Sequence, residues 1–481
     1  MSIFLGIDFG TSTICVTRWK ETNNQVEIVP PIVSSDYGRT GPIENVIFYN
    51  NKSERLIGSP AMKKMQLDPH LFVSGIKREL EGTGWQREIH GELKTAVDVA
   101  SDIFIYIREA IEKMYGGSQI DGVVVSVPFA YQHRERQRIK LAAEKAGLPV
   151  FSLIEEPVAA ALSCGLFDNK DIQDGEKVLV FDFGGGTLDV TIFEKNRESD
   201  GTVCIEVITT DGHKKLGGKD IDQRTIDKLT SLLKIDLTSK PMDRRMDNFR
   251  NQIRQEAEEV KKALTMEEEY ELFFEDSWGE AHNEYISKDL FNEWIEPDIL
   301  VKVQEVLEDT LEDVELDKED IKHIVLVGGS SQIIAVQELI TEFFGKRPIV
   351  PKNLDELVGL GAGMYCGMIK SGASPYRVVQ KLSHGTGINV GGKMKVILPR
   401  NTAYGEWSDF VYSTNTPIIA IYQGNSTILK NCSQVGTIDI SSYVIDYHDT
   451  KLQLGTSQNG AICYRLYKNG NLIVEEELKE A

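Results

Sequence analysis

A ten-residue segment with a glycine turn occurs in two similar copies in this chain, and this repeat constrains the fold more than any other feature. Residues 8–17 read Asp-Phe-Gly-Thr-Ser-Thr-Ile-Cys-Val-Thr, and residues 182–191 read Asp-Phe-Gly-Gly-Gly-Thr-Leu-Asp-Val-Thr. Each copy follows a short apolar run, at 3–7 or 178–181, and precedes an apolar, β-branched one. Each copy is therefore predicted to be strand, turn and strand. Their duplication predicts two similar lobes with a cleft between them.

The residue types in both turns suit a polyphosphate and a metal ion. Glycines allow backbone N–H groups to surround phosphate oxygens, and hydroxyls add donors. An aspartate at a strand end can hold a hydrated divalent cation. Ordinary hairpins also favour glycine and aspartate, but two copies in register favour phosphate binding. The candidates are Gly10, Thr11, Ser12, Thr13, Gly184, Gly185, Gly186 and Thr187 for phosphate, and Asp8 and Asp182 for a metal ion bound through water.

A third glycine turn follows the buried-strand pattern at 324–327. Gly328, Gly329, Ser330 and Ser331 precede a predicted helix at 333–344. Such a loop can hold a nucleotide's ribose or base, with Ser330 or Ser331 capping the helix. The same sequence also makes an ordinary strand-to-helix loop.

Between the second and third turns, the spacing predicts a helix with two faces. The apolar stripe consists of Ile253, Ala257, Val260 and Leu264, and the polar stripe of Glu258, Lys261, Lys262 and Thr265. On spacing alone, the polar stripe is read as a solvated face with Glu–Lys pairs.

The chain is acidic, with 53 Lys and Arg against 74 Asp and Glu and a net charge of −21. Nucleic acids and anionic membranes need a basic face, so we expect neither as a partner. We find no apolar run long enough to span a bilayer. The six cysteines form no Cys-x-x-Cys pair, which fits a reducing cytoplasm.

After Gly372 the pattern changes from long helices to short strands. Apolar runs separated by glycine and asparagine turns predict a small all-β sandwich of about one hundred residues. The expected strands are 394–398, 418–422, 435–440, 462–467 and 472–476.

Taken together, these segments resemble the seventy-kilodalton heat-shock chaperone family (DnaK-like) nearly from end to end. The resemblance is carried by the two Asp-Phe-Gly turns, Val127-Pro128, Leu153-Ile-Glu-Glu-Pro-Val-Ala-Ala-Ala161, Leu216-Gly-Gly-Lys-Asp220 and Val327-Gly-Gly-Ser330. The turns are shared with the wider actin and sugar-kinase superfamily, whereas the Glu-Glu-Pro-Val-Ala-Ala-Ala stretch and the C-terminal region are narrower signals.

The resemblance implies an α/β fold class: an actin-like, two-lobed ATPase domain built from ribonuclease-H-like repeats, followed by the sandwich. The expected nucleotide-binding domain is 1–370, with lobe I at about 1–171 plus 352–370 and lobe II at about 172–351. The expected linker is 371–381, and the truncated, peptide-binding-like β-domain is 382–481. Because the chain stops at Ala481, we expect a β-domain without the family's helical lid.

The resemblance also implies roles for residues at matching positions. Lys77, Glu156, Asp182 and Thr187 would be catalytic in a slow hydrolysis of ATP to ADP and phosphate, with Mg²⁺ as cofactor and K⁺ as an additional candidate ion. Glu156 would help to position the attacking water. The nucleotide would contact Gly217, Gly218, Glu258, Lys261, Lys262, Thr265, Gly328, Gly329, Ser330 and Asp355. Lys262 and Gln332 stand where the family usually has arginine, which implies altered contacts to the base.

The implied partner is an unfolded peptide or client protein. Ile388, Tyr412 and Ile419 could line an apolar groove for it, or could be sandwich core. J-domain co-chaperones and nucleotide exchange factors are the family's other partners. Ser152 stands where the family commonly has a basic residue important for J-domain proteins, whereas Pro128 and Arg136 match positions tied to interdomain signalling.

Three other functions share part of this pattern. A sugar-kinase-like phosphotransferase has the two hairpins but not the sandwich or the Glu-Glu-Pro-Val-Ala-Ala-Ala stretch. An actin-like scaffold would polymerise with ATP. A nucleotide-gated binding module would show little turnover, and the lysine at 262 and the glutamine at 332 are compatible with it.

Overall fold

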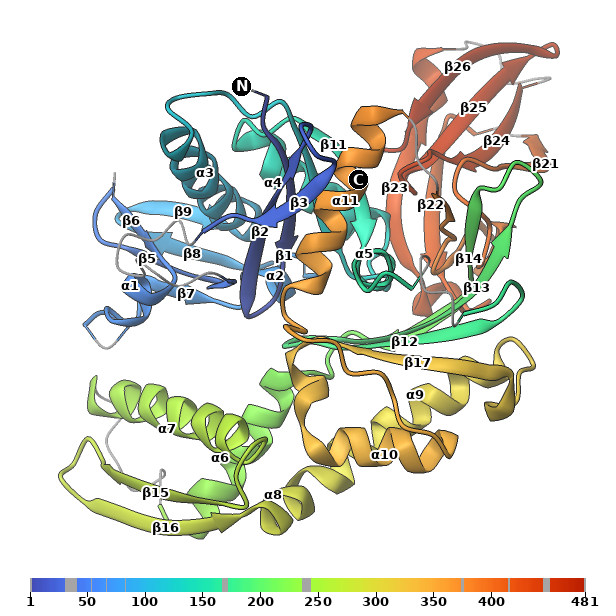
Figure 1. Cartoon of the computed structure of the whole chain (residues 1–481). Helices are drawn as coiled ribbons and strands as arrows, with labels where there is room; N and C mark the ends of the chain where they lie inside the picture. The colour runs from blue at the N-terminus through green and yellow to red at the C-terminus, as the bar shows by residue number, and fades with distance from the viewer. Residues whose placement is uncertain are drawn as a thin grey trace.

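The computed structural model describes residues 2–30, 41–52, 54–65, 67–82, 84–166, 172–235, 244–372, 376–413, 416–443 and 450–479. Figure 1 shows two lobes, one above the other, and a C-terminal all-β part beside the upper lobe. We call the upper lobe lobe I, the lower lobe lobe II, and the part from Leu382 onward the β-domain. No helix among the described residues is long and apolar enough to cross a membrane.

Lobe I is built on a sheet with the strand order β11-β10-β1-β2-β3, and β4 also pairs with β2. β1 and β2 form the antiparallel hairpin expected from the first turn, and β10 runs parallel to β1. Burial of Leu5 and Ile7 on β1 explains the apolar run that precedes the turn. The bounds are β1 Phe4–Phe9, β2 Thr13–Lys20, β3 Gln25–Ile28, β4 Ile43–Glu44, β10 Gly122–Val127 and β11 Val150–Glu155.

Lobe II repeats this arrangement in a sheet with the order β17-β12-β13-β14-β18. β12 and β13 form the second hairpin, β14 follows antiparallel, and β17 lies parallel to β12 as β10 does to β1. The duplication predicted from two turns therefore extends over both sheets. The bounds are β12 Lys177–Phe183, β13 Leu188–Arg197, β14 Val203–His213, β17 Ile321–Val327 and β18 Tyr376–Val379.

The helix α11 (Leu357–Ser371) returns the chain from lobe II to the sheet of lobe I. It packs so closely on α5 (Glu156–Ser163) that a Cβ on Gly361 would lie 1.8 Å from the carbonyl oxygen of Ala159. A Cβ on Gly6 of β1 would lie 2.1 Å from the backbone nitrogen of Gly363. Glycine is therefore required at 361, where α11 meets α5, and at 6, where β1 meets α11.

The remaining elements cover the sheets and extend each lobe outward (Figure 1). Lobe I adds β5 Val46–Tyr49, β6 Arg55–Ile57, α1 Ser59–Met62, β7 Phe72–Ser74, α2 Ile76–Glu79, β8 Gln86–Ile89, β9 Glu92–Thr95, α3 Ala96–Met114 and α4 His133–Lys145. Lobe II adds α6 Gly218–Leu232, α7 Arg244–Ala263, β15 Glu269–Glu275, β16 Ala281–Ser287, α8 Lys288–Ile295, α9 Val301–Glu312 and α10 Ile334–Phe344. The apolar stripe predicted on α7 is confirmed, because Ile253, Ala257, Val260 and Leu264 are all buried.

The β-domain consists of two four-stranded sheets, β20-β19-β22-β23 and β21-β24-β25-β26, around one apolar core. The bounds are β19 Gly385–Val390, β20 Lys393–Leu398, β21 Trp407–Ser413, β22 Ile418–Gly424, β23 Ser433–Asp439, β24 Thr450–Thr456, β25 Ile462–Lys468 and β26 Asn471–Glu477. All five expected strands correspond to strands of these sheets, and the sequence prediction missed β19, β21 and β24.

The chain between the lobes and the β-domain is itself part of a sheet. Residues 376–379, inside the expected linker, form β18, which pairs in parallel with β14 over Val203–Glu206. Immediately after it, Lys381 forms an ion pair with Glu206 on β14 (2.8 Å). Lobe II therefore holds the start of the β-domain through backbone and side-chain contacts.

The β-domain also docks on lobe I through buried polar contacts. The Arg136 Nη2 atom donates to Glu155 Oε1 at 2.6 Å, and the hydroxyl of Tyr404, from the β-domain, donates to the same oxygen. Both ring nitrogens of His133, on α4, contact the β-domain backbone. The Ile462 N–H donates to Nδ1 (3.1 Å), and Nε2 lies 2.7 Å from the Leu478 carbonyl oxygen. We call Arg136, Glu155 and Tyr404 the docking trio.

Candidate nucleotide site

The two glycine turns meet at their tips, between the lobes. A Cβ on Gly185 would lie 2.2 Å from Ser12 Oγ, and a Cβ on Gly186 would lie 2.3 Å from Thr11 Oγ1. Gly217 joins the same contact, because its Cβ would lie 2.6 Å from the Gly186 backbone nitrogen. Larger residues at these glycines would push the hairpins apart.

Each turn places an aspartate at the end of its strand, directly below the tip. Asp8 on β1 accepts a hydrogen bond from Ser126 Oγ at 2.6 Å, and Asp182 on β12 is paired in register with Asp189 on β13. Burial, with the nearby Glu156 carboxylate second, raises the pKa of Asp8 to about 6. Burial and the charges of Glu156, Asp189 and Asp8 raise the pKa of Asp182 well above its usual range. These carboxylates therefore place more negative charge at the bottom of the cleft than they themselves can balance.

A buried ion pair supplies part of the missing positive charge. The Lys77 Nζ atom, from α2, donates to Glu156 Oε1 at the start of α5, and Lys77 is only 2% exposed. The attraction of Glu156 and Asp8 raises the pKa of Lys77 although burial opposes this, so the ammonium stays charged. The two residues are 79 positions apart in the sequence, and the fold brings them together beneath the turns.

These acids fit a divalent cation. The Oδ2 atom of Asp182 is buried and has no hydrogen-bond partner among the described residues. A buried carboxylate oxygen without a partner is costly, and a hydrated Mg²⁺ ion, which prefers oxygen ligands and retains waters, would satisfy it. Asp8 and Asp182 are the residues that would hold such an ion.

The third glycine turn is attached to the second. The Ser330 hydroxyl donates to the Gly184 carbonyl oxygen at 2.8 Å, and Ser331 donates to the Val327 carbonyl oxygen at 2.6 Å. The expectation that one of these serines caps the following helix is wrong, since the N-cap of α10 is Ile333. Ser330 instead fixes the third turn against the phosphate turns.

The candidate residues on the nucleoside side lie along one edge of lobe II. Lys261 forms an ion pair with Asp222 (2.6 Å) and lies 3.5 Å from the Gly218 carbonyl oxygen, which ties α7 to the start of α6. Lys262 forms an exposed i,i+4 pair with Glu258 (2.9 Å). Thr265 Oγ1 donates to the Lys261 carbonyl oxygen at 3.0 Å. The Lys262–Glu258 pair agrees with the solvated-face interpretation. Lys261 does not, because its side chain is only 15% exposed and its partner lies on α6.

Two further candidates lie at the rim. Gly329 has open space around its Cβ position as far as the described residues extend, whereas a Cβ on Gly328, whose φ is +79°, would lie 2.5 Å from the Phe183 carbonyl oxygen. Asp355 is exposed in the loop before α11. Gly329 and Asp355 therefore face solvent. Position 328 requires glycine because of its positive φ and its close approach to Phe183.

The candidate peptide residues are not exposed in this structure. Ile388 is 2% exposed and Ile419 is 5% exposed, and both contact the apolar core of the β-domain. The side chain of Tyr412 lies outside the described residues. Ile388 and Ile419 are therefore core residues of the sandwich in this conformation, which is the second of the two interpretations.

Sequence reasoning missed three residues beside the turns. Ser126 holds Asp8, and Arg78 Nη2 bridges the lobes by donating to the Gly186 carbonyl oxygen and to Asp220 Oδ2, both at 2.6 Å. Lys219 extends between the lobes toward Thr11. Arg78 is adjacent to Lys77 in the sequence, and Lys219 lies within the Leu216-Gly-Gly-Lys-Asp220 motif, whereas only the fold indicates the position of Ser126.

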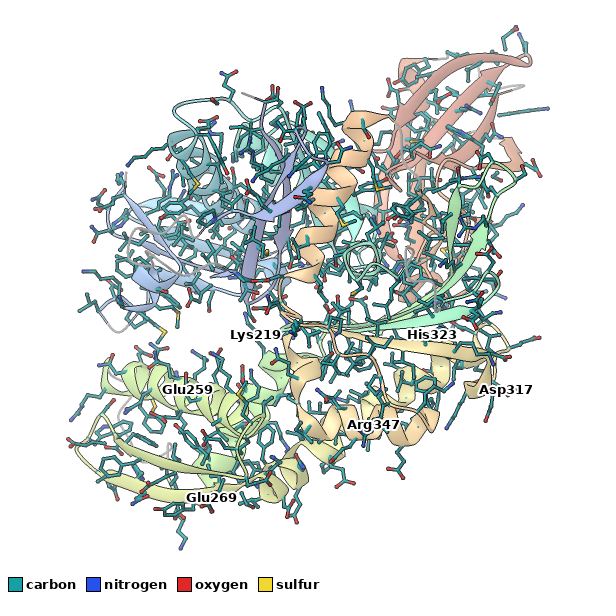
Figure 2. The ribbon with its side chains drawn as sticks, viewed as in Figure 1. Lys219, Glu259, Glu269, Asp317, His323 and Arg347 are labelled. Atoms are coloured by element: carbon teal, nitrogen blue, oxygen red, sulfur yellow. The ribbon has the colours of Figure 1, made fainter. Side chains whose placement is uncertain are left out.

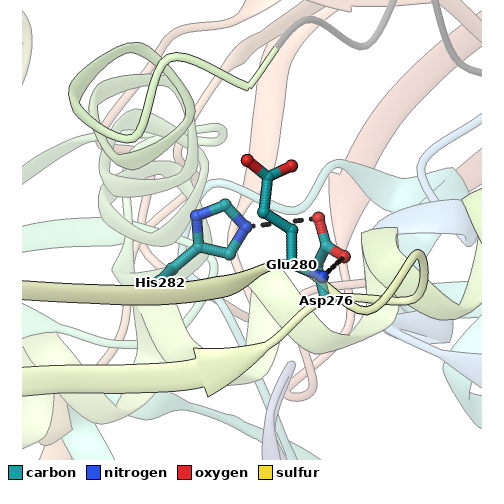
Figure 3. A group of neighbouring side chains, drawn as sticks. All are labelled: Asp276, Glu280 and His282. Carbon is teal, nitrogen blue, oxygen red and sulfur yellow. Dashed lines mark hydrogen bonds and ion pairs between the residues drawn. The ribbon is translucent and has the colours of Figure 1, made fainter.

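A separate group of potential metal ligands lies on the β15–β16 hairpin, at the outer end of lobe II. Asp276, Glu280 and His282 offer ligand atoms within 4.8 Å of one another (Figure 3). Asp276 Oδ1 already accepts the Trp278 and Glu280 N–H groups, and Oδ2 lies 3.2 Å from His282 Nε2. We interpret this group as the hydrogen-bonded turn that closes the hairpin.

The duplicated sheets, each with a glycine turn at the cleft, are typical of two-lobed, actin-like ATPases. Residues 81–444, about three quarters of the chain, match the family model described as Hsp70 protein, and the chain belongs to the Hsp70 family. Members of this family are chaperones with an ATPase domain and a β-sandwich. They use ATP or ADP with Mg²⁺, and they generally bind client peptides and co-chaperones.

Proposed function

We propose that this chain is a DnaK-like chaperone ATPase that binds Mg-ATP between lobes I and II and hydrolyses it slowly. The observation that carries the proposal is the buried Lys77–Glu156 pair under the two phosphate turns. A buried ion pair carries a desolvation cost and is weak evidence of a stabilising role. Because this pair lies close to Asp8 and Asp182 at the cleft, it supports a role in chemistry.

In this proposal each residue has a defined task. The backbone N–H groups and hydroxyls of the turns bind the phosphates, Glu156 orients the attacking water, and Lys77 faces the charge that develops on the terminal phosphate. Asp8 and Asp182 hold Mg²⁺ through its waters. The ion neutralises phosphate charge when it is bound. No covalent intermediate with the protein is required.

The test is a single-turnover ATPase measurement on Lys77→Ala. We expect hydrolysis to fall roughly 100- to 1,000-fold, as when one preorganised positive or donor group is removed from a transition state, with little change in ATP affinity by calorimetry. Lys63→Ala, an exposed lysine in lobe I, serves as the control. Unchanged turnover in Lys77→Ala would refute the assigned mechanism.

We also propose that the β-domain binds peptide or protein segments. The family membership supports this, whereas the burial of Ile388 and Ile419 means that these two side chains are not open to a peptide in the conformation described. Single-turnover hydrolysis with and without an unfolded peptide tests both parts, since coupled domains would give a peptide-dependent rate. Equal rates, together with no peptide binding by fluorescence anisotropy, would rule the peptide proposal out.

A further inference from the structure

Lys219 occupies a place in the cleft that the proposed mechanism does not yet use. It is the second residue of α6, whose start is fixed to the second phosphate turn: the Gly218 N–H donates to the Gly184 carbonyl oxygen and the Lys219 N–H to the Gly185 carbonyl oxygen, both at 3.0 Å. Figure 2 shows Lys219 at the junction of the two lobes. Its backbone therefore moves with the second turn.

The Lys219 side chain crosses from lobe II to lobe I. Its Nζ atom lies 3.5 Å from the Thr11 carbonyl oxygen, in the first phosphate turn. The same atom fills the space beside Gly75, where a Cβ would lie only 2.5 Å from it. Gly75 has a φ of +68° and directly precedes α2, which carries Lys77. The ammonium thus lies where both phosphate turns and the Lys77 helix meet.

Among the described residues, no carboxylate forms an ion pair with Lys219. Its neighbour Arg78 has a carboxylate partner, Asp220 (2.6 Å), and Asp222 is paired with Lys261 (2.6 Å). No carboxylate of the described residues lies within 4.0 Å of the Lys219 ammonium. Burial, followed by the positive charge of Arg78, lowers the pKa of Lys219 to about 8. A cation held in this way has an unfavourable environment that an anion would relieve.

We propose that Lys219 contacts the terminal phosphate of a bound nucleoside triphosphate and makes the cleft prefer a triphosphate over a diphosphate. The inference rests on the proposed function, because it assumes that nucleotide binds between the turns. Lysine acts on phosphate as a flexible point charge, and the Lys219 ammonium lies beside Gly75, next to the helix that carries Lys77. Because the Lys219 side chain extends from lobe II to lobe I, its contact with a bound triphosphate would add an ionic interaction between the two lobes.

The competing interpretation is that Lys219 only ties lobe II to Thr11. In that case its loss would weaken the binding of every nucleotide to a similar extent, since the cleft would lose its shape. A phosphate contact would affect only the ligand that carries the third phosphate. The ratio of the two affinities therefore separates the interpretations.

The experiment measures the calorimetric affinity of the full chain, with Mg²⁺, for ADP and for a non-hydrolysable ATP analogue. For Lys219→Gln we expect the affinity for the analogue to fall by about 10-fold or more, as expected for loss of one charged hydrogen bond, and the affinity for ADP to change less than about twofold. Lys219→Arg, which retains the charge, should restore most of the preference. Lys228→Gln, on the same helix, is the matched control.

An equal loss of affinity for both nucleotides, or no loss for either, would overturn the proposal for Lys219 while leaving the proposed function in place. A wild-type chain that binds neither nucleotide would instead refute the proposed function, and the inference would fall with it. Circular dichroism melting of each variant shows whether a lost affinity reflects a lost fold.

Discussion

Replacing Tyr404 with phenylalanine should loosen the β-domain from lobe I without altering either fold. The Tyr404 hydroxyl and the Arg136 guanidinium donate to one oxygen of Glu155, and the Glu155 side chain is fully buried. The substitution deletes one hydroxyl and leaves the ring, so packing is retained. Its effect therefore reports the value of one hydrogen bond across the domain contact.

The magnitude follows from the charge and the burial of the acceptor. A hydrogen bond to a charged group contributes about 1.5–3 kcal/mol, which corresponds to a roughly 10- to 100-fold change in the docking equilibrium. Arg136→Met should cost more, about 3–5 kcal/mol, because it leaves the Glu155 carboxylate buried without its cation. A larger loss of docking free energy in Arg136→Met than in Tyr404→Phe is therefore a further test of the docking trio.

The Ile462 amide provides a direct assay, because its acceptor, His133 Nδ1, belongs to lobe I. Undocking exposes this N–H to solvent, so its hydrogen-exchange protection should fall by the same factor as the docking equilibrium. Tyr467→Phe is the control, since that hydroxyl bonds to Gln453 Oε1 (3.1 Å) inside the β-domain. Unchanged Ile462 protection in Tyr404→Phe, or an equal loss in Tyr467→Phe, would refute the reasoning.

Two further predictions concern stability. Gly361→Ala should lower the unfolding free energy by about 1–3 kcal/mol or more, because its Cβ would meet the Ala159 carbonyl oxygen. Gly84→Ala should not, since the Cβ position of Gly84 is in open space among the described residues. Thermal melting of both variants checks this prediction, and equal melting temperatures would contradict it. Burial, followed by the charges of Lys214, Arg400 and Arg136, lowers the pKa of His384 to about 3. A histidine with a lowered folded-state pKa contributes stability above its unfolded pKa of about 6.5 and loses it as the pH falls, by roughly 2 kcal/mol at pH 5. His384→Asn should therefore show a smaller loss of stability than wild type between pH 7 and pH 5, and parallel losses would argue against this assignment.

The sequence allowed the paired hairpins to be predicted because their signal is local. Strand, glycine turn and strand appear within ten residues, and the repeat in itself indicates two similar lobes. The β-domain was predicted less completely. β19 begins with Gly-Thr-Gly, which weakens a strand signal, although β24 alternates Leu452 and Leu454 with polar residues and was identifiable by its period of two.

The interlobe and interdomain contacts were beyond sequence reasoning. Lys77 and Glu156 were each named as catalytic only through the family resemblance, and their ion pair was not predicted. Lys219 stands inside the Leu216-Gly-Gly-Lys-Asp220 motif, but the motif does not show that its side chain reaches the first phosphate turn. Ser330 resembled a helix cap because serine is among the residues preferred at the N-cap position. Its hydroxyl instead bonds to Gly184, 146 positions away, and such long-range competition cannot be read from local patterns.

The β-domain touches both lobes at once, and this has a mechanical consequence. On lobe II it is held by β18, by Lys381 and by Arg400, which contacts Asp313 and the Thr210 carbonyl oxygen. On lobe I it is held by His133 and the docking trio. A body fastened to both lobes restrains their rotation relative to one another, so release of the β-domain from either lobe should leave the two lobes freer to move apart.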